Sequence, residues 1–195
     1  AVLGIDRPYF LFVGTLEPRK NLRRLLAAFA ALPRELRETA LLVVAGGQGW
    51  GGVDLATLRA EHQLERQVVV TGYVGDAQLA TLYAHARFLA MPSLYEGFGL
   101  PIVEAMQYGT PVLVSDSSSL PEVAGDAGML VDPLDVRAMA EALALLIRDD
   151  AVRDCLAARA KENVEKFSWT RAAREAMEVF AEAVAERRHR VRARV

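Results

Sequence analysis

The chain has 195 residues, a net charge of −2, 52% hydrophobic residues and 25% charged residues. This is a globular composition, and it excludes a disordered chain and a strongly basic nucleic-acid-binding protein, so we expect no nucleic-acid partner. The single cysteine, Cys155, excludes a disulfide framework within the chain and fits a reducing compartment. No apolar run reaches the roughly 20 residues that cross a bilayer. These features predict a cytoplasmic protein.

Strand-like and helix-like segments alternate along most of the chain. The strand-like runs are almost entirely apolar rather than alternating, which is typical of strands buried on both faces in a parallel sheet. We expect strands at 9–14, 41–47, 68–72, 88–92, 111–115 and 128–132. We expect helices at 21–32, 54–62, 76–86, 101–108 and 135–148, with Asp76 and Asp135 as N-caps. This alternation predicts an α/β fold, a doubly wound (Rossmann-like) six-stranded parallel sheet with helices on both faces.

After residue 150 the pattern is helical only. Helices are predicted at 151–166 and, capped by Ser168, at 169–188, and the chain ends in an arginine-rich tail. The first strand begins almost at once, so we expect residues 1–8 to be a linker from an N-terminal domain outside this sequence. The expected organisation is a Rossmann-like domain over 9–166 and a C-terminal helix with a basic tail over 167–195.

The winding predicts where a ligand binds. In the usual order 3-2-1-4-5-6 the first and fourth strands are neighbours, and a crevice opens at their carboxyl ends. Two loops then border this crevice, GTLEPRKN at 14–21 and SLYEGFGL at 93–100.

The two loops carry complementary chemistry. Arg19 and Lys20 provide cations close to a helix N-terminus, where anions bind well. Glycines in the second loop let bare amides approach a ligand, and Glu96 and Glu104 can accept hydrogen bonds from sugar hydroxyls. Such a set of groups matches a sugar joined to a diphosphate.

A simpler interpretation exists for each residue alone. Arg19 and Lys20 could form a solvated helix start, Glu96 an exposed loop carboxylate and Glu104 an ordinary exposed helix residue. The hypothesis depends on their conjunction at the switch point of the sheet.

Two other kinds of site are not supported. Gly47, Gly49 and Gly52 match the spacing G-x-G-x-x-G, but they follow the second strand, so a glycine-rich surface loop is favoured over a dinucleotide site. The histidines are scattered and Cys155 stands alone, so no metal-ligand cluster is predicted.

Five stretches carry a resemblance to a known family: VGTLEPRKN, LLVVAGG, VVVTGYV, SLYEGFGLPIVEAMQYGTPVLVSD and LPEVAGDAGMLVDPLD. The long central stretch is specific, because it places two glutamates around seven residues and follows them with a glycine and a proline-led strand. The chain resembles the C-terminal, donor-binding domain of the retaining glycosyltransferases of family four (glycosyl transferases group 1). The resemblance implies one half of a GT-B fold.

The resemblance also implies roles. Glu104 is expected to hold the ribose hydroxyls and Glu96 the donor sugar, while Arg19 and Lys20 neutralise the departing diphosphate; Glu96, Arg19 and Lys20 are the expected catalytic residues. The amides at 98–100 are expected to meet the sugar and phosphates, and residues 73 and 74 the base. Family members commonly carry arginine where this chain has Thr15, so Arg19 is expected to take more of the phosphate charge. The other expected donor-binding residues are Gly14, Thr15, Tyr73, Val74, Gly97, Phe98, Gly99 and Leu100.

By the same resemblance the chain transfers a hexose from a GDP- or UDP-sugar with retention, with no cofactor and no metal, to a glycan or lipid-linked acceptor bound by the absent N-terminal domain. The GTLEPRKN loop is most similar to mannosyltransferases, which favours GDP-mannose. The alternatives are a GT-B epimerase or phosphorylase, or a nucleotide-binding module without chemistry. The arginine-rich tail is expected to be a solvated end, a contact with the partner domain, or a peripheral contact with the inner membrane surface.

Overall fold

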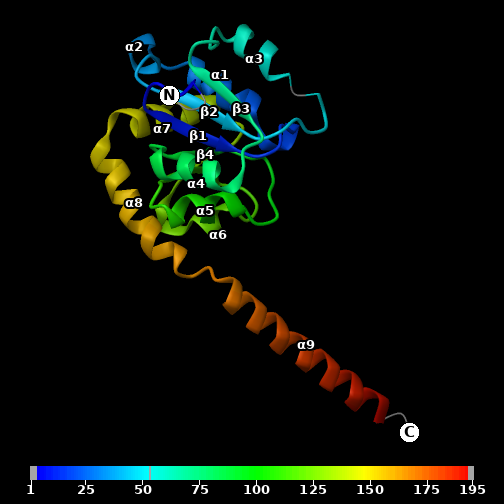
Figure 1. Cartoon of the computed structure of the whole chain (residues 1–195). Coiled ribbons are helices and arrows are strands. Elements are labelled where there is room, and N and C mark those ends of the chain that lie inside the picture. The colour runs from blue at the N-terminus through cyan, green and yellow to red at the C-terminus, as the bar shows by residue number, and fades with distance from the viewer. Residues whose placement is uncertain (1–3, 53, 193–195) are drawn as a thin grey trace. The chain divides into compact units, whose positions relative to one another are not determined.

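The structure is a computed structural model that describes residues 4–52 and 54–192. It contains two compact units, Ala1–Val164 and Glu165–Val195, and each is described by itself. The first unit is an α/β domain built on one sheet, which lies between helices (Figure 1).

The sheet has six strands in the order β3-β2-β1-β4-β5-β6, and every pairing is parallel. The predicted winding is therefore confirmed, and β1 lies beside β4 through the pair Leu11 and Leu89. The strands are β1 (Tyr9–Val13), β2 (Leu41–Ala45), β3 (Val68–Gly72), β4 (Leu89–Met91), β5 (Val112–Ser115) and β6 (Gly128–Val131).

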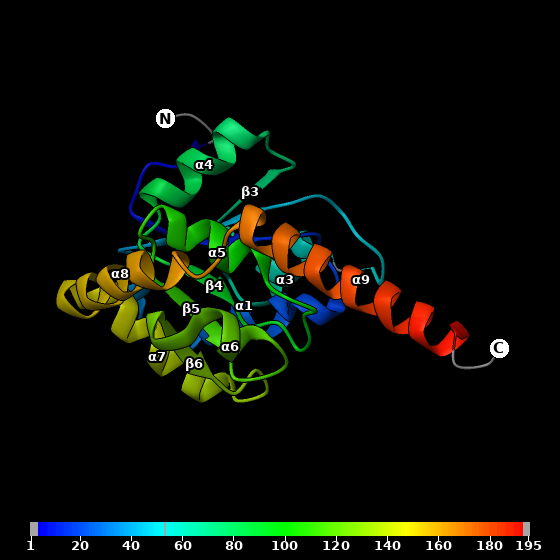
Figure 2. The same ribbon diagram turned by 90° about the horizontal axis from the view of Figure 1, so that it is seen from below.

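Helices cover both faces of the sheet (Figures 1 and 2). On one face α1 packs against α3 and α7, and on the other α5 packs against α4, α6 and α8. The helices of this unit are α1 (Leu22–Ala30), α2 (Arg34–Arg37), α3 (Leu55–Glu61), α4 (Asp76–His85), α5 (Leu100–Gln107), α6 (Leu120–Ala124), α7 (Val136–Arg148) and α8 (Asp150–Val164), with 3-10 turns η2 (Pro18–Lys20) and η3 (Gly125–Ala127).

The core forms because both faces of the central strands are covered, so their apolar side chains are buried. Phe10 of β1 is fully buried; its ring meets Phe29 of α1 edge-on and stacks on Phe88, with both ring-centre distances at 5.0 Å. Helix α1 packs its apolar face into this core, since Leu22, Leu25, Leu26 and Phe29 are all buried.

Most predicted elements exist with ends shifted by one to three residues, but several local predictions were wrong. Asp76 is the first residue of α4 rather than its cap, and Gly75 occupies the cap position. The short helices α2 and α6 and the turn η2 were not predicted. Asp135 does cap α7, because its carboxylate accepts hydrogen bonds from the amides of Arg137 and Ala138.

A buried asparagine joins three loops at the carboxyl ends of the strands. Asn21 follows η2 in a left-handed conformation with φ of 61°, which asparagine tolerates better than most residues. Its side-chain nitrogen donates to the carbonyls of Pro92, after β4, at 2.9 Å and of Pro133, after β6, at 2.7 Å. The first loop is thereby fixed to the other half of the sheet.

Asn21→Asp is expected to lower the free energy of unfolding by about 3 kcal/mol, because the oxygen that replaces the amide nitrogen would face two carbonyl oxygens, while Arg24 continues to donate to the other oxygen. Asn21→Gly loses the same bonds but suits the positive φ, so about half that loss is expected. Urea denaturation of both variants measures the difference. Equal stability of the two would contradict this account of the amide.

The second unit contains α9 (Trp169–Arg192). The predicted cap is present, since the amide of Arg171 donates to Oγ of Ser168 at 3.4 Å, but the helix continues past the predicted end at 188. Within its described side chains, α9 exposes Trp169, Met177, Val179, Phe180 and Val184. Among the described residues, no helix is both long and apolar enough to span a membrane.

Candidate functional site

The two predicted loops meet at the carboxyl ends of β1 and β4. The amide of Leu94, in the loop after β4, donates to the carbonyl of Arg19, in the loop after β1, at 2.8 Å. Because β1 and β4 are the strands at which the winding changes direction, this contact lies at the switch point that the sequence predicts.

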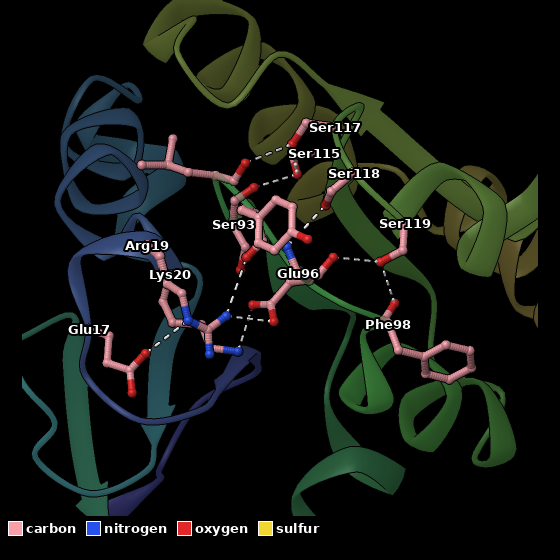
Figure 3. A network of polar contacts seen from close by, with 12 residues as sticks. Glu17, Arg19, Lys20, Ser93, Glu96, Phe98, Ser115, Ser117, Ser118 and Ser119 are labelled. Carbon is pink, nitrogen blue, oxygen red and sulfur yellow. Dashed lines mark hydrogen bonds and ion pairs between the residues drawn. The ribbon is translucent and has the colours of Figure 1, made fainter.

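An ion cluster joins the loops (Figure 3). One carboxylate oxygen of Glu96 lies 2.7 Å from Nζ of Lys20, and the other lies 2.7 Å from a terminal nitrogen of Arg19. Arg19 also donates from Nε to Glu17 at 2.9 Å. Two carboxylates therefore neutralise two cations, and each cation is held in place before any ligand arrives.

The cluster overturns the solvated interpretation for two of its members. Only 8% of the Lys20 side chain and 9% of the Glu96 side chain are exposed, whereas Arg19 keeps 39%. Burial alone would raise the pKa of Glu96, but the contacts with Lys20 and Arg19 outweigh it and hold this pKa below its ordinary value of 4.5. Glu96 is therefore ionised at neutral pH.

Two serines after β5 hold the backbone around Glu96 (Figure 3). The amide of Glu96 donates to Oγ of Ser118 at 3.0 Å. The hydroxyl oxygen of Ser119 lies 3.0 Å from the carbonyl oxygens of both Glu96 and Phe98, and its single proton is shared between them. The bend at 96–98 is thus attached to a third loop of the same edge of the sheet.

The same serine-rich loop also supports the start of the second loop. Ser115, the last residue of β5, donates to the carbonyl of Ser93 at 2.6 Å, and Ser117 donates to that of Leu94 at 3.2 Å. Hydrogen bonds from this loop therefore fix the backbone of the loop that carries Glu96 at several positions.

Glycine stands at positions 97 and 99 of the bend for different structural reasons. Gly99 has φ of +106° and lies against α6, so an added Cβ would come within 2.8 Å of Leu120 Cδ2; the fold itself requires glycine there. At Gly97 a Cβ would meet nothing within 4 Å, and its φ is ordinary. Gly97 leaves open space beside the ion cluster, as a site for close approach of a ligand to the backbone would.

Glu104, on α5, is held by a tyrosine. The buried hydroxyl of Tyr83, on α4, donates to one carboxylate oxygen of Glu104 at 2.8 Å, and the Tyr83 ring stacks on Tyr108 with centres 6.1 Å apart. Burial, followed by the nearby Glu104 carboxylate, raises the pKa of Tyr83 far above its ordinary value, so the phenol remains a donor. Glu104 is half-buried and partnered rather than an ordinary exposed helix residue.

Tyr83→Phe is expected to reduce the free energy of unfolding by about 1 kcal/mol, the usual net value of one hydrogen bond. Tyr108→Phe is the matched control, because it keeps the stacked ring and removes a hydroxyl from a half-exposed side chain. Chemical denaturation of both proteins at pH 7 makes the comparison. A Tyr83→Phe protein as stable as the control would show that the bond to Glu104 contributes nothing.

The remaining predicted donor-binding residues lie on three loops of this edge. Gly14 follows β1, and Thr15 after it is exposed. Tyr73 after β3 is 84% exposed, but Val74 is buried. At the start of α5, the side chains of Phe98 and Leu100 are 43% and 47% exposed.

The glycine-rich loop after β2 packs against the first loop. The amide of Leu16 donates to the carbonyl of Gly47 at 3.0 Å, and a Cβ on Gly49 would lie only 2.6 Å from Thr15 Cγ2. These glycines therefore serve close packing of two loops. Across the described part of the chain, no three histidine, cysteine or acidic side chains group together as metal ligands would.

The sequence analysis missed several residues of this site. It gave the cations and Glu96 separate ligand roles and did not predict that they bind one another. Apart from Glu17, which lies two residues before Arg19, the partners of these groups come from elsewhere in the chain, so no local spacing reveals them. The run of three serines at 117–119 was an available signal, since hydroxyls on a loop of this edge have backbone groups within reach. The missed residues are Glu17, Asn21, Tyr83, Ser93, Ser115, Ser117, Ser118 and Ser119.

Known proteins share both the sequence and the fold. The family model of glycosyl transferases group 1 matches residues 2–167. O-antigen chain mannosyltransferase B of Escherichia coli is 45% identical over 161 residues, which are 83% of this chain and 42% of that protein. D-inositol 3-phosphate glycosyltransferase of Nocardioides sp. is 36% identical over 208 residues, which are 98% of this chain and 45% of that protein.

Among solved structures, sucrose-phosphate synthase from Thermosynechococcus elongatus superposes with a TM-score of 0.81 at 30% identity, over 93% of this chain and 46% of that one. WaaG, a glycosyltransferase of lipopolysaccharide biosynthesis, superposes with a TM-score of 0.78 at 23% identity, over 91% of this chain and 48% of that one, which shows the shared fold. The chain thus spans less than half the length of these relatives and forms one half of a GT-B fold. By its family match over most of its length, the chain belongs to the glycosyl transferases of group 1.

Proposed function

We propose that this chain is the donor-binding half of a retaining hexosyltransferase and that it binds the diphosphate of a nucleotide sugar at the ion cluster. The observation that carries the proposal is the position of Arg19 and Lys20. Both cations are fixed by Glu96 at the switch point of the sheet, beside the open space at Gly97. Fixed cations cost less to organise when an anion arrives, which favours both binding and the departure of the diphosphate.

Each group then has a task. Arg19 and Lys20 contact the diphosphate and stabilise the negative charge that develops on it as the bond to the sugar breaks. Glu96 accepts hydrogen bonds from the donor sugar while it keeps both cations in place. Glu104 uses the oxygen that Tyr83 leaves free to accept a ribose hydroxyl. No cofactor or metal is assigned a step.

The relatives favour mannose. The relative at 45% identity is named a mannosyltransferase, and so is WbdA of Escherichia coli, at 35% identity over 174 residues. We therefore propose GDP-mannose as the donor. Because the chain spans 42% of the first relative and 21% of the second, we propose that a domain outside this sequence binds the acceptor, and that efficient transfer needs it.

Isothermal titration calorimetry of the 195-residue chain with GDP, UDP, GDP-mannose and UDP-glucose tests this function. We expect both nucleoside diphosphates to bind at one site and GDP to bind more tightly than UDP. Tighter binding of UDP would overturn the mannose assignment alone. If none of the four ligands binds, the proposed function itself is wrong.

Location at the inner face of a membrane remains a proposal that the basic end of the sequence supports, since residues 187–194 contain five arginines in addition to His189. Sedimentation with vesicles of phosphatidylglycerol, compared with vesicles of phosphatidylcholine, tests it. A chain truncated after 186 should lose the binding to the anionic vesicles, and equal sedimentation of both chains would refute the role of the tail.

A further inference from the structure

The loop after β5 departs twice from local conformational preference, at Ser118 and Ser119. Ser118 has φ of 53°, in the left-handed region, which costs a residue with a Cβ about 1 kcal/mol or more. Ser119 occupies the N-cap position of α6, yet its hydroxyl makes no capping bond with that helix. Departures of this kind are expected where a chain gives up local stability for a site.

Both hydroxyls are used on the bend that carries Glu96. Ser118 accepts from the amide of Glu96, and Ser119 donates to the carbonyls of Glu96 and Phe98. The hydroxyl that would cap α6 therefore fixes two peptide groups of another loop.

The position of those carbonyls decides where the next amides point. No peptide bond among the described residues is cis, and in a trans peptide the N–H points opposite to the carbonyl. Because the carbonyls of Glu96 and Phe98 both point at Ser119, the amides of Gly97 and Gly99 both point away from it. Neither amide donates to another described residue in the hydrogen bonds of the structure.

The ion cluster and Ser119 lie on opposite sides of Glu96. In Figure 3, Glu96 stands between Arg19 and Lys20 on one side and Ser119 on the other. Backbone amides that are aimed to the same side of a glycine-containing turn, without a partner of their own, can donate to an anion.

We infer that Ser118 and Ser119 are positioning residues that orient the Gly97 and Gly99 amides toward the phosphates of the donor. The inference rests on the proposed function, because it takes the anion to be the nucleoside diphosphate. Neither serine touches the donor; each acts through the backbone of the bend.

Ser119→Ala and Ser118→Gly test the inference, with Thr39→Ala as the matched control, because the Thr39 hydroxyl also donates to a carbonyl, that of Leu36, but lies before β2 and away from the bend. GDP affinity is measured by calorimetry, guanosine affinity by ligand-observed NMR and thermal stability by circular dichroism. We expect both test variants to bind GDP about five- to tenfold more weakly, with guanosine affinity unchanged, since only the phosphates meet the amides. The control should bind GDP within about twofold of the parent chain.

Ser118→Gly separates positioning from folding. Glycine suits the positive φ of residue 118, so this variant should be as thermally stable as the parent chain or more so, while it loses GDP affinity. Unchanged GDP affinity in Ser118→Gly and Ser119→Ala would overturn the inference. A loss of guanosine affinity as large as the loss of GDP affinity in these variants would overturn it as well. Either result would leave the proposed function intact. A parent chain that binds neither GDP nor UDP would instead overturn the proposed function, and the inference with it.

Discussion

Replacing Glu96 with glutamine is expected to lower the free energy of unfolding at pH 7 by about 3 kcal/mol. Glutamine keeps the shape of the side chain but leaves the buried Lys20 ammonium without an opposite charge, and breaking a buried ion pair from one side is costly in this range. The half-exposed Arg19 keeps its bond to Glu17 and should lose less. Urea denaturation of the two proteins provides the measurement.

The loss of stability caused by Glu96→Gln should become smaller as the pH falls. The folded structure holds the pKa of Glu96 below 4.5, so the folded state favours the ionised form. The stabilisation by this carboxylate is therefore complete above pH 4.5 and disappears as the pH falls through the lower folded pKa. The difference between the parent chain and Glu96→Gln should be constant from pH 7 to about 5.5 and narrow below 4.5. If the difference in the free energy of unfolding between the two proteins is the same below pH 4.5 as at pH 7, the ion-pair account is wrong.

Replacing Lys20 with methionine is expected to weaken GDP binding by about 100-fold. Methionine keeps most of the buried aliphatic stem but removes the ammonium, and a charge-assisted hydrogen bond to phosphate contributes up to about 3 kcal/mol. The fold should tolerate this change better than the loss of Glu96, because Arg19 still pairs with the carboxylate that Lys20 leaves.

Lys161→Met is the matched control for Lys20→Met, since Lys161 lies exposed on α8. Calorimetry with GDP on the three proteins, combined with thermal denaturation, separates binding from stability. If Lys20→Met binds GDP within threefold of the control, Lys20 is a structural partner of Glu96 and does not contact the diphosphate.

Ligand binding and stability should be coupled at this site. Glu96 contacts both Arg19 and Lys20, and in the proposed function a bound diphosphate shares these two cations with the Glu96 carboxylate. The serine-rich loop holds the backbone of Glu96 while this exchange takes place. The ion cluster thus stabilises the folded state without ligand, and the proposed function gives its two cations a second use.

The sequence alone predicted the winding of the sheet and the two loops that meet at its switch point. Continuous apolar runs such as 41–45 fit only a strand buried on both faces, and once the strands alternate with helices, the two loops at the switch point follow. The resemblance then identified the family, which the comparisons confirm. Helix ends and short helices such as α2 were predicted less well, because their local signals are weak.

Only the tertiary structure decided how the charged groups are used. Nothing near Lys20 in the chain shows that its ammonium is buried, because its partner Glu96 is 76 residues away. Ser119 shows the same limit, since local preference assigns its hydroxyl to α6 and the fold brings two carbonyls of another loop within its reach. Hydrophobic periodicity is a local property that a sequence displays, whereas ion pairs and hydrogen bonds between loops depend on which strand ends the sheet places side by side.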